Sequence, residues 1–341
     1  MKSGDKLAAM IKVAVLGAGA WGTALAKLLA DKHYLTTIWS HRAELVEQIN
    51  EGHVNARYLP SADLPPNLRA SADLEEALRG AELVVTVVPS HALRGVMREA
   101  RPFVPSNALI CSATKGIEND SLALMSDVLL QELGHETQPR LTYLSGPSFA
   151  KEVAQRQPTV VVVAGTSELE TETVQRAFAT DRFRVYSSND VPGVEIGGAL
   201  KNVIAIAAGA GDGLGFGHNS RAALITRGLS EIGKLAARKG ANPLTVAGLS
   251  GMGDLVLTCT GELSRNRTVG YEMGKGRTLS DVLATLGHVA EGVKTAKSAY
   301  DLSLKLDVDM PITQEVYQVL YADKSPRQAV VDLMTRALSR E

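Results

Sequence analysis

The glycine motif at 17–22 (GAGAWG) most constrains what this chain can fold into, because it joins the apolar run 11–16 to the helical stretch 20–30. In such a strand-to-helix turn, Gly17 makes the tight bend, Gly19 lets a pyrophosphate approach the backbone, and Gly22 lets the helix pack closely on the strand. The N-terminus of the helix then faces the negative phosphates. The pattern predicts a nicotinamide dinucleotide site; a glycine-rich turn in some other βα unit is the alternative.

The end of the second strand decides which dinucleotide is preferred, since NAD-preferring enzymes usually place an acidic residue there to bond the ribose 2′-hydroxyl. Here the run 35–39 is followed by Ser40, His41 and Arg42, so no acid stands at that position. A guanidinium presents a fork of donors that fits phosphate oxygens, and a protonated His41 would add to it. NADP(H) is therefore favoured and NAD(H) stays open, because a solvated surface turn would have the same residues.

The composition argues against several classes of partner. The 341 residues include 36 basic and 37 acidic side chains, for a net charge of −1, so no global field attracts nucleic acid or an anionic membrane. Cys111 and Cys259 are too few for a disulfide framework and lack metal-ligand spacing, which suits a reducing cytoplasm and predicts no metal. The longest apolar stretches fall short of the roughly 20 residues that span a bilayer, so no membrane insertion is expected.

The order of elements predicts an α/β fold in two domains. Residues 1–10 lack the apolar core of a signal peptide and are expected to form a flexible tail. Residues 11–190 alternate β-branched runs with helical stretches, as in a Rossmann-type, mostly parallel sheet with helices on both faces. The candidate strands are Val13 to Leu16, Thr36 to Trp39, Leu83 to Val88, Ala108 to Ser112, Leu141 to Ser145, Val160 to Ala164 and Phe183 to Tyr186.

Residues 191–341 have long helical periodicities, which predict an all-α second domain. Because the polar clusters described below lie in it, this domain is expected to carry the substrate and the catalytic group. Near the end of the chain, Ser325 precedes Pro326 and stands three residues before Gln328, the pattern of a helix N-cap. We expect the helix that follows to bury Ala329 and Met334, among other apolar residues.

The stretch 196–211 of this second domain contains only two polar residues, Lys201 and Asn202. A helix that is apolar on all sides is normally buried, and burial disfavours the charged form of a lysine. Lys201 is therefore a candidate general acid or base. The alternatives are a lysine that reaches solvent from the start of a structural helix and a lysine in a buried ion pair.

A second polar cluster, Ser264-Arg265-Asn266-Arg267, follows farther along the chain. Ser264 can cap a helix, whose N-terminal N–H groups would meet an amide and two guanidinium groups there. This chemistry suits a phosphomonoester, although a basic surface helix would have the same sequence. Asp254, in a glycine-rich segment, is either a turn residue or a partner of the substrate or the lysine.

Six motifs in this order resemble the bacterial NAD(P)-dependent glycerol-3-phosphate dehydrogenases, from about residue 11 to 338. They are the segments 17–22 (GAGAWG), 113–116 (ATKG), 145–150 (SGPSFA), 199–203 (ALKNV), 253–255 (GDL) and 264–267 (SRNR). The resemblance implies reversible reduction of dihydroxyacetone phosphate to sn-glycerol 3-phosphate for glycerophospholipid synthesis. It also implies a cytoplasmic homodimer that acts on a small phosphorylated triose.

The same resemblance assigns roles to individual residues, with Lys201 as the proton donor or acceptor. The substrate would be surrounded by Lys115, Gly146, Ser148, Lys201, Asp254, Ser264, Arg265 and Asn266. The cofactor contacts that the resemblance implies are Ala20, Trp21, His41, Tyr58, Lys115, Ala150, Arg265, Val289 and Glu291. The glycine motif and the end of the second strand add Gly17, Gly19, Gly22 and Arg42 to them. Ala20 departs from the serine of many members, which removes one hydroxyl near the pyrophosphate and leaves the backbone donors.

Two other functions fit parts of the sequence. One is a two-domain dehydrogenase of hydroxyacids or sugar acids, which need not bind phosphate. The other is a sensor that binds NADPH without catalysis, in which Lys201 would have no evident purpose. Turnover with phosphorylated and unphosphorylated substrates separates the three.

Overall fold

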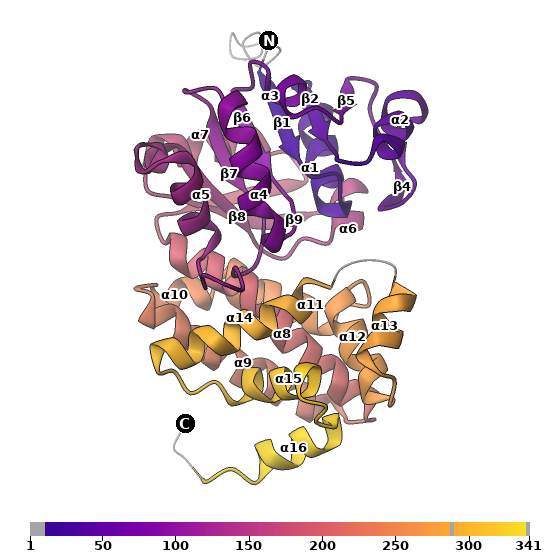
Figure 1. Cartoon of the computed structure of the whole chain (residues 1–341), viewed down its shortest axis with the longest axis vertical. Helices are drawn as coiled ribbons and strands as arrows, with labels where there is room; N and C mark the ends of the chain where they lie inside the picture. The colour runs from indigo at the N-terminus through magenta and orange to yellow at the C-terminus, as the bar shows by residue number, and fades with distance from the viewer. Residues whose placement is uncertain (1–10, 287–289, 339–341) are drawn as a thin grey trace. The chain divides into compact units, whose positions relative to one another are not determined.

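The computed structural model describes residues 11–286 and 290–338, which divide into two compact units. Of the described residues, the first unit comprises 11–115 and 125–191, and the second comprises 116–124, 192–286 and 290–338. Each unit has its own cluster of buried apolar side chains. Figure 1 labels the helices of the two units and most of the strands.

The first unit alternates strands and helices, as the sequence predicts. Its strands are β1 (Lys12–Leu16), β2 (Leu35–Trp39), β3 (Val54–Asn55), β4 (Leu59–Asp63), β5 (Leu68–Ser71), β6 (Leu83–Thr86), β7 (Leu109–Ser112), β8 (Leu141–Ser145), β9 (Thr159–Gly165) and β10 (Phe183–Ser188). Its α-helices are α1 (Ala20–Asp31), α2 (Ala43–Gly52), α3 (Leu74–Leu78), α4 (Ser90–Ala100), α5 (Met125–Leu133), α6 (Ala150–Ala154) and α7 (Glu168–Phe178).

Eight of these strands form one sheet in the order β10-β9-β8-β7-β6-β1-β2-β5. Strands β5, β2, β1, β6, β7 and β8 run parallel, whereas β9 is antiparallel to β8 and parallel to β10. All residues of β6 and β8 are buried, as expected of strands covered by helices on both faces. The mostly parallel Rossmann-type sheet predicted from the sequence is therefore confirmed.

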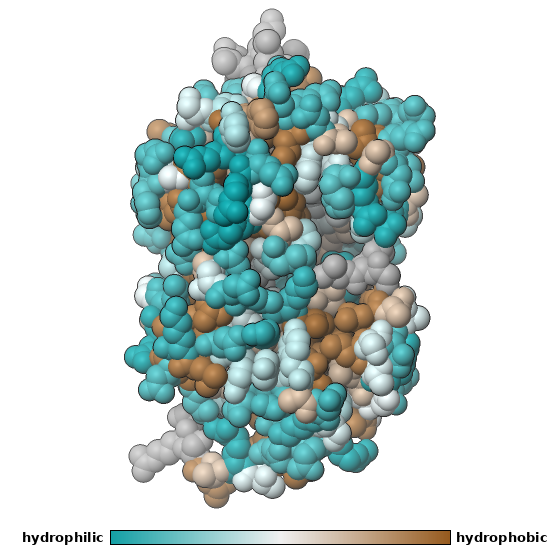
Figure 2. Space-filling model, in the orientation of Figure 1, coloured by the Kyte–Doolittle hydropathy of each residue, from teal (hydrophilic) through white to brown (hydrophobic). Residues whose placement is uncertain are grey.

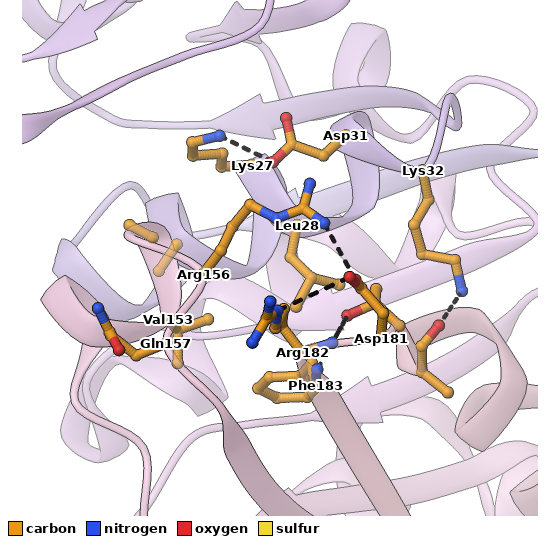
Figure 3. A pocket seen from close by; sticks show the side chains of 14 residues that line it. Lys27, Leu28, Asp31, Lys32, Val153, Arg156, Gln157, Asp181, Arg182 and Phe183 are labelled. Carbon is orange, nitrogen blue, oxygen red and sulfur yellow. Dashed lines mark hydrogen bonds and ion pairs between the residues drawn. The ribbon is translucent and has the colours of Figure 1, made fainter.

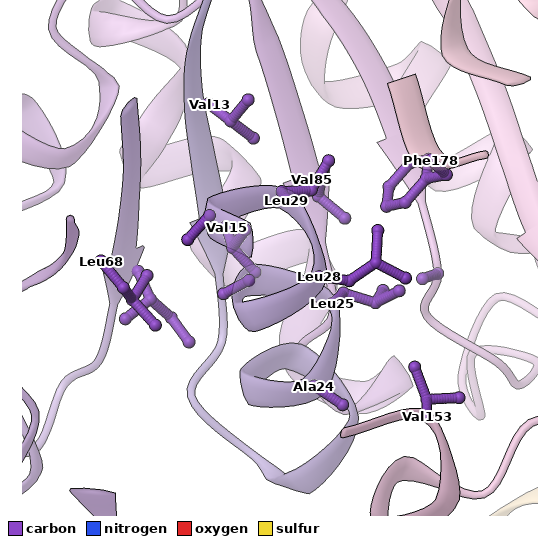
Figure 4. Packing of buried hydrophobic residues seen from close by; sticks show 14 of the residues in the cluster. Val13, Val15, Ala24, Leu25, Leu28, Leu29, Leu68, Val85, Val153 and Phe178 are labelled. Carbon is purple, nitrogen blue, oxygen red and sulfur yellow. The ribbon is translucent and has the colours of Figure 1, made fainter. Parts of the chain in front are cut away.

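Helix α1 fills the centre of the first core. Its Leu25 and Leu29 are fully buried, and Figure 4 shows them among Val15, Val85 and Phe178. The buried leucines of α1 recur three to four positions apart, so one stripe of this helix packs on the sheet. The packing fixes the start of α1 next to the glycine motif.

The second unit is helical. Its helices are α8 (Val191–Gly213), α9 (His218–Arg238), α10 (Pro243–Val246), α11 (Asp254–Thr260), α12 (Arg265–Gly274), α13 (Leu279–Leu286), α14 (Glu291–Leu306), α15 (Pro311–Tyr321) and α16 (Pro326–Met334). A π-helical turn, Leu249–Gly253, leads into α11. These elements agree with the all-α second domain that the sequence predicts.

Helix α8 is long and apolar enough to cross a membrane by length and composition alone, and 89% of its most apolar window is buried inside the protein. Many of its residues belong to the cluster of buried apolar side chains in the second unit, among them Leu200, Val203 and Ile204. At the surface, polar side chains cover most of the face drawn in Figure 2.

The structure differs from the predicted domains in one segment. The expected first domain, 11–190, was continuous, but residues 116–124 belong to the second unit. Ile117 and Leu124 pair in an isolated antiparallel bridge and lie in the helical unit's apolar cluster, and Ser298 Oγ donates a hydrogen bond to the carbonyl of Ile117. These two apolar side chains are buried against helices that follow far later in the chain.

The last helix also differs from expectation. Ser325 Oγ accepts a hydrogen bond from the backbone N–H of Gln328 at 3.1 Å, so the predicted cap is present. Ala329 is buried, but Met334 is 80% exposed. The expected burial of Met334 is wrong, because α16 packs on the protein through Ala329 and Leu333, and Met334 is left in solvent.

Candidate functional site

The glycine motif bends the chain between β1 and α1. Gly17 has a φ of +120°, and a Cβ there would lie 2.9 Å from the carbonyl oxygen of Val87. A Cβ at Gly22 would collide with the carbonyl oxygen of Gly17. Around Gly19, by contrast, a Cβ would meet no atom within 4 Å. Gly17 and Gly22 thus serve the turn itself, while Gly19 borders open space that a side chain would partly fill.

The N-terminus of α1 faces this space without a side-chain cap. Gly19 is the N-cap residue, and Ala20 and Trp21 form the first turn. The first N–H groups of a helix have no partner inside the helix and carry a partial positive charge. Backbone donors beside an open glycine fit a pyrophosphate. The motif is therefore compatible with the phosphates of a dinucleotide.

A buried asparagine that sequence reasoning missed braces this turn. Asn55 Nδ2 donates to the carbonyl of Ala18 at 2.9 Å and to Thr23 Oγ1 at 2.8 Å. Asn55 Oδ1 accepts from the backbone N–H of Tyr58 at 3.1 Å. A single asparagine in a polar segment has no sequence signature, so only the fold reveals this role.

His41 and Arg42 lie between the end of β2 and the start of α2. His41 is exposed and its ring lies 6.4 Å from that of Trp39, while Arg42 stands at the N-cap of α2. Arg42 Nη1 is 3.7 Å from Glu44 Oε1. Tyr58 is half-buried, with the Arg57 guanidinium 5.5 Å from its ring centre. These residues all belong to the first unit.

Three further predicted residues meet at the backbone of Gly146, at the end of β8. Lys115 Nζ lies 3.4 Å from the Gly146 carbonyl oxygen, to which Ser148 Oγ donates at 3.0 Å. Gly146 has a φ of +135°, and a Cβ there would lie 2.9 Å from the Cα of Val161 in β9. Ala150 begins α6 four residues later. The close approach of β9 therefore requires glycine at position 146, independently of any ligand that Gly146 contacts.

In the second unit, Lys201 and Asp254 form a buried ion pair. Lys201 is 8% exposed and Asp254 is fully buried, and Lys201 Nζ lies 2.5 Å from Asp254 Oδ1. Thr258 Oγ1 donates to the Asp254 carbonyl at 2.6 Å. Burial alone disfavours the ammonium form of lysine, and an adjacent carboxylate favours it. The ion pair that the sequence left open for both residues is therefore present, and it leaves the proposed role of Lys201 in proton transfer open.

The π-helical turn before α11 positions Asp254. It packs on α8 at Gly197, where a Cβ would lie 2.7 Å from the carbonyl oxygen of Ser250 and 3.0 Å from the Cα of Gly251. Gly197 stands one helical turn before Lys201, so this close approach brings the start of α11 to the lysine. Single-turn π-helices are frequent at functional sites.

The residue after the lysine connects α8 with two other helices. Asn202 Oδ1 accepts from Asn266 Nδ2 at 2.8 Å, and Asn266 Oδ1 accepts from the backbone N–H of Gly292 at 2.9 Å. Glu291 begins α14 at this point. Asn266 is thereby held in the first turn of α12, and Val289, a predicted cofactor contact, lies outside the described residues.

Ser264 caps α12 as predicted, because its Oγ accepts from the backbone N–H of Arg267 at 3.2 Å. Arg265 is exposed and makes no ion pair among the described residues. Arg267 differs from the expectation of two converging guanidinium groups. Its Nη2 lies 2.6 Å from Asp212 Oδ2, and Arg221 pairs with the other oxygen of Asp212. Of the two arginines, only Arg265 is available to an anion.

A cavity of about 260 Å³ lies elsewhere in the first unit, between α1, α6 and the start of β10 (Figure 3). Its cations already have partners: Lys27 pairs with Asp31, Arg156 pairs with Asp181, and Lys32 Nζ donates to two backbone carbonyls. Burial lowers the pKa of Lys32 to about 8. None of the residues predicted for catalysis or binding lines this cavity.

The described ranges 11–286 and 290–338 hold no group of three His, Cys, Asp or Glu side chains with the arrangement of a metal site.

Comparison with known proteins identifies the family. Residues 12–170 match the N-terminal part of the NAD-dependent glycerol-3-phosphate dehydrogenases, and residues 190–331 match their C-terminal part. A protein of Citrifermentans bemidjiense named glycerol-3-phosphate dehydrogenase (NAD(P)+) is 55% identical over 330 residues, covering 97% of this chain and 98% of its own. One of the same name from Myxococcus xanthus is 56% identical over 322 residues, covering 94% and 96%.

A solved structure agrees with these relatives. The crystal structure of glycerol-3-phosphate dehydrogenase from Coxiella burnetii has a TM-score of 0.92 and 39% identity, and the match covers 96% of this chain and 99% of that one. The resemblance predicted from the six motifs is confirmed. The chain belongs to the family of NAD(P)-dependent glycerol-3-phosphate dehydrogenases.

Proposed function

We propose that the protein reduces dihydroxyacetone phosphate reversibly to sn-glycerol 3-phosphate, with Lys201 as the general acid and base. The buried Lys201–Asp254 pair carries the proposal, because a buried lysine held by one carboxylate has a fixed position and an exchangeable proton. The names of the relatives at over 50% identity support the substrate.

The first unit supplies the cofactor site. A nicotinamide dinucleotide would supply the hydride when bound. The amides at the start of α1 and the open space at Gly19 fit its pyrophosphate. Arg42, at the N-cap of α2, would favour NADPH over NADH by pairing with a 2′-phosphate. By resemblance, Lys115, Gly146 and Ser148 bind the substrate.

In the second unit, Lys201 would give its proton to the oxygen of the ketone as that oxygen gains negative charge. Asp254 accepts a hydrogen bond from Nζ and so holds the amino group of Lys201 in one position. In the reverse direction the neutral amine would take the proton of the alcohol. Asn202, held by Asn266, is adjacent to the lysine and can keep this part of α8 in register.

The phosphate of the substrate is the proposed ligand of Arg265 and of the first turn of α12. An exposed guanidinium and backbone N–H groups at a helix N-terminus are both donors suited to phosphate oxygens. A cytoplasmic location, a homodimer and a role in supplying glycerophospholipid synthesis complete the proposal and are supported by family resemblance alone. The molar mass from light scattering, measured as the protein elutes from a size-exclusion column, tests the homodimer.

The deciding experiment follows nicotinamide absorbance when the purified protein is mixed with dihydroxyacetone phosphate and either NADPH or NADH. Oxidation of the cofactor supports the substrate and the reaction together. Reduction of an unphosphorylated hydroxyacid precursor, with none of the triose phosphate, would replace this function by that of a hydroxyacid dehydrogenase. Folded protein that binds NADPH and turns over neither substrate class would favour the sensor.

A further inference from the structure

Glu44, in the first turn of α2, lies between two arginines of the first unit. Its Oε1 is 3.7 Å from Arg42 Nη1 and 3.8 Å from Arg57 Nη1. Because both contacts end on the same oxygen, the two guanidinium groups can be no farther apart than the sum of these distances. Two arginines therefore share one carboxylate at the end of the second strand, where a dinucleotide-binding sheet recognises the adenosine ribose.

The two contacts to Glu44 are weak. Both are too long for hydrogen bonds, and the side chains of Arg42, Arg57 and Glu44 are 37%, 41% and 59% exposed. Ion pairs of this kind stabilise a protein little. Arg42 Nε is in addition buried, with no hydrogen-bond partner in the described part of the chain. The arginines thus keep donors that Glu44 does not use.

The backbone holds the two arginines in place from separate segments. Arg42 precedes α2, and its N–H donates to Ser40 Oγ at 3.1 Å. Arg57 lies between β3 and β4, and its guanidinium packs 5.5 Å from the ring centre of Tyr58. Helix α2 contacts β3 directly, and Arg42 and Arg57 flank these two elements in the sequence. The spacing of the arginines is therefore a property of the fold.

A phosphate monoester fits between these arginines better than Glu44 does. At neutral pH it carries a charge of about −1.5 to −2 and three acceptor oxygens, whereas a carboxylate carries one charge and two oxygens. Charge-assisted bonds from guanidinium to phosphate form at about 2.7–2.9 Å, well below the distances to Glu44. A ribose hydroxyl, which is neutral, cannot displace the carboxylate in this way.

We propose that Arg57 joins Arg42 in a subsite for the 2′-phosphate of the cofactor, and that Glu44 is the exchangeable anion which this phosphate displaces. With a cofactor that lacks the phosphate, Glu44 stays between the arginines and its carboxylate is available to accept the ribose 2′-hydroxyl. One loosely held acid thereby serves both cofactors. This inference rests on the proposed use of a nicotinamide dinucleotide.

The test measures the Kd of NADPH and of NADH, by the fluorescence of the reduced nicotinamide, for the wild type and for Arg57→Gln. Losing one guanidinium bond to a charged phosphate should weaken NADPH binding about tenfold or more, with NADH binding changed less than twofold. Arg79→Gln is the matched control, because Arg79 is exposed and lies 3.7 Å from one oxygen of Glu75 in the same unit. It should change neither Kd.

Glu44→Gln tests the displacement itself. Removing the competing carboxylate should tighten NADPH binding about threefold or more and should leave NADH binding unchanged or weaker. In the double variant Arg57→Gln/Glu44→Gln, the gain from Glu44→Gln should shrink. An Arg57→Gln variant that weakens both cofactors equally, or changes NADPH binding no more than Arg79→Gln does, would overturn the subsite. Weaker NADPH binding in Glu44→Gln would overturn the displacement.

Binding and turnover separate this inference from the proposed function. Protein that binds both cofactors as expected but does not reduce dihydroxyacetone phosphate would refute the proposed reaction and leave the subsite standing. Protein that binds neither cofactor would refute both. Turnover with both cofactors, combined with an Arg57→Gln variant that matches the control, would refute the subsite alone.

Discussion

Lys201 is a basic group almost wholly removed from water, and its ion pair with Asp254 explains how the fold tolerates it. Replacing Lys201 by methionine should lower kcat by about 10²–10⁴-fold, the usual contribution of a general acid or base, with a smaller change in KM. Steady-state rates of cofactor oxidation check this. Lys297→Met is the control, since Lys297 pairs with Asp301 at 2.8 Å on the surface of the same unit.

The single variant also leaves Asp254 buried without its partner, a change that commonly costs about 3–5 kcal/mol of stability. The double variant Lys201→Met/Asp254→Asn removes both charges and should recover most of that loss, while its turnover stays low. Rates near wild type in a folded variant without Lys201 would exclude the lysine from proton transfer.

Arg265 differs from Arg267 in the same turn of α12, since Arg267 is bound to Asp212 and Arg265 is exposed. Arg265→Ala should therefore raise the KM for dihydroxyacetone phosphate about tenfold or more, because one charge-assisted bond to phosphate is lost, and should leave the melting temperature unchanged. Arg277→Ala, just beyond the same helix, is the control. An unchanged KM would remove Arg265 from phosphate binding.

Helix α15 depends on a buried carboxylate for its N-terminal cap. Glu231 of α9 accepts from the N–H of Ile312 at 2.6 Å, from the N–H of Thr313 at 3.0 Å and from Thr313 Oγ1 at 2.9 Å. Glu231→Ala should destabilise the protein by about 2–5 kcal/mol, because buried donors lose their acceptor. In urea unfolding, Ser325→Ala at the exposed cap of α16 should cost only about 1 kcal/mol. Equal losses would show that burial of the cap matters little.

The same carboxylate makes stability depend on pH. Burial raises the pKa of Glu231, so the folded protein holds this proton more tightly than the unfolded chain does. The contribution of Glu231 to stability is therefore complete below its unfolded pKa of about 4.3 and falls as pH rises through the folded pKa. The difference in unfolding free energy between wild type and Glu231→Gln should be larger near pH 4.5 than near pH 7.5. A difference that grows with pH would contradict the assignment.

Local patterns predicted those elements whose partners are local. The glycine motif, the seven strands that the sequence predicts and the caps of α12 and α16 each depend on residues within a few positions of one another, whereas the eighth strand of the sheet, β5, was not predicted. Contacts between distant residues were not predictable in this way. Asp212 binds Arg267, which lies 55 positions later in the sequence, and so removes it from the predicted phosphate-binding cluster. Asn55 donates a hydrogen bond to the carbonyl of Ala18, which lies 37 positions earlier. Neither residue has a sequence signature of its own.

The division of the chain into two units was likewise predictable only where local sequence patterns determine it. The change from β-rich to helical periodicity indicates a boundary near 190, and the contacts place one after Val191. Nothing local marks 116–124 as part of the helical unit, because Ile117 and Leu124 would suit either core. Similarly, the antiparallel direction of β9 is set by how the chain returns from β8, whereas its apolar residues would fit a parallel strand equally well.

Each unit contains one buried thiol, which gives the whole molecule two internal reporters of unfolding. Cys111 lies in β7 of the first unit and Cys259 in α11 of the second, both fully buried, and burial raises the pKa of each to about 12. Thiolates are the reactive form, so neither residue should react with an alkylating reagent at pH 8 in the native protein. In urea, each cysteine should be labelled when its own unit opens.

Because the glycine motif belongs to the first unit, NADPH should protect Cys111. At a concentration of 100 times its Kd, a ligand that binds only the folded state adds about 2.7 kcal/mol of stability, so the urea midpoint for labelling Cys111 should rise clearly. Mass spectrometry of the two cysteine peptides measures both midpoints in one sample. Equal shifts of the two labelling midpoints would mean that the units unfold as one cooperative body. A shift confined to the midpoint of Cys111 would mean that the units unfold separately. A Cys111 midpoint that NADPH does not move would contradict cofactor binding at the first unit.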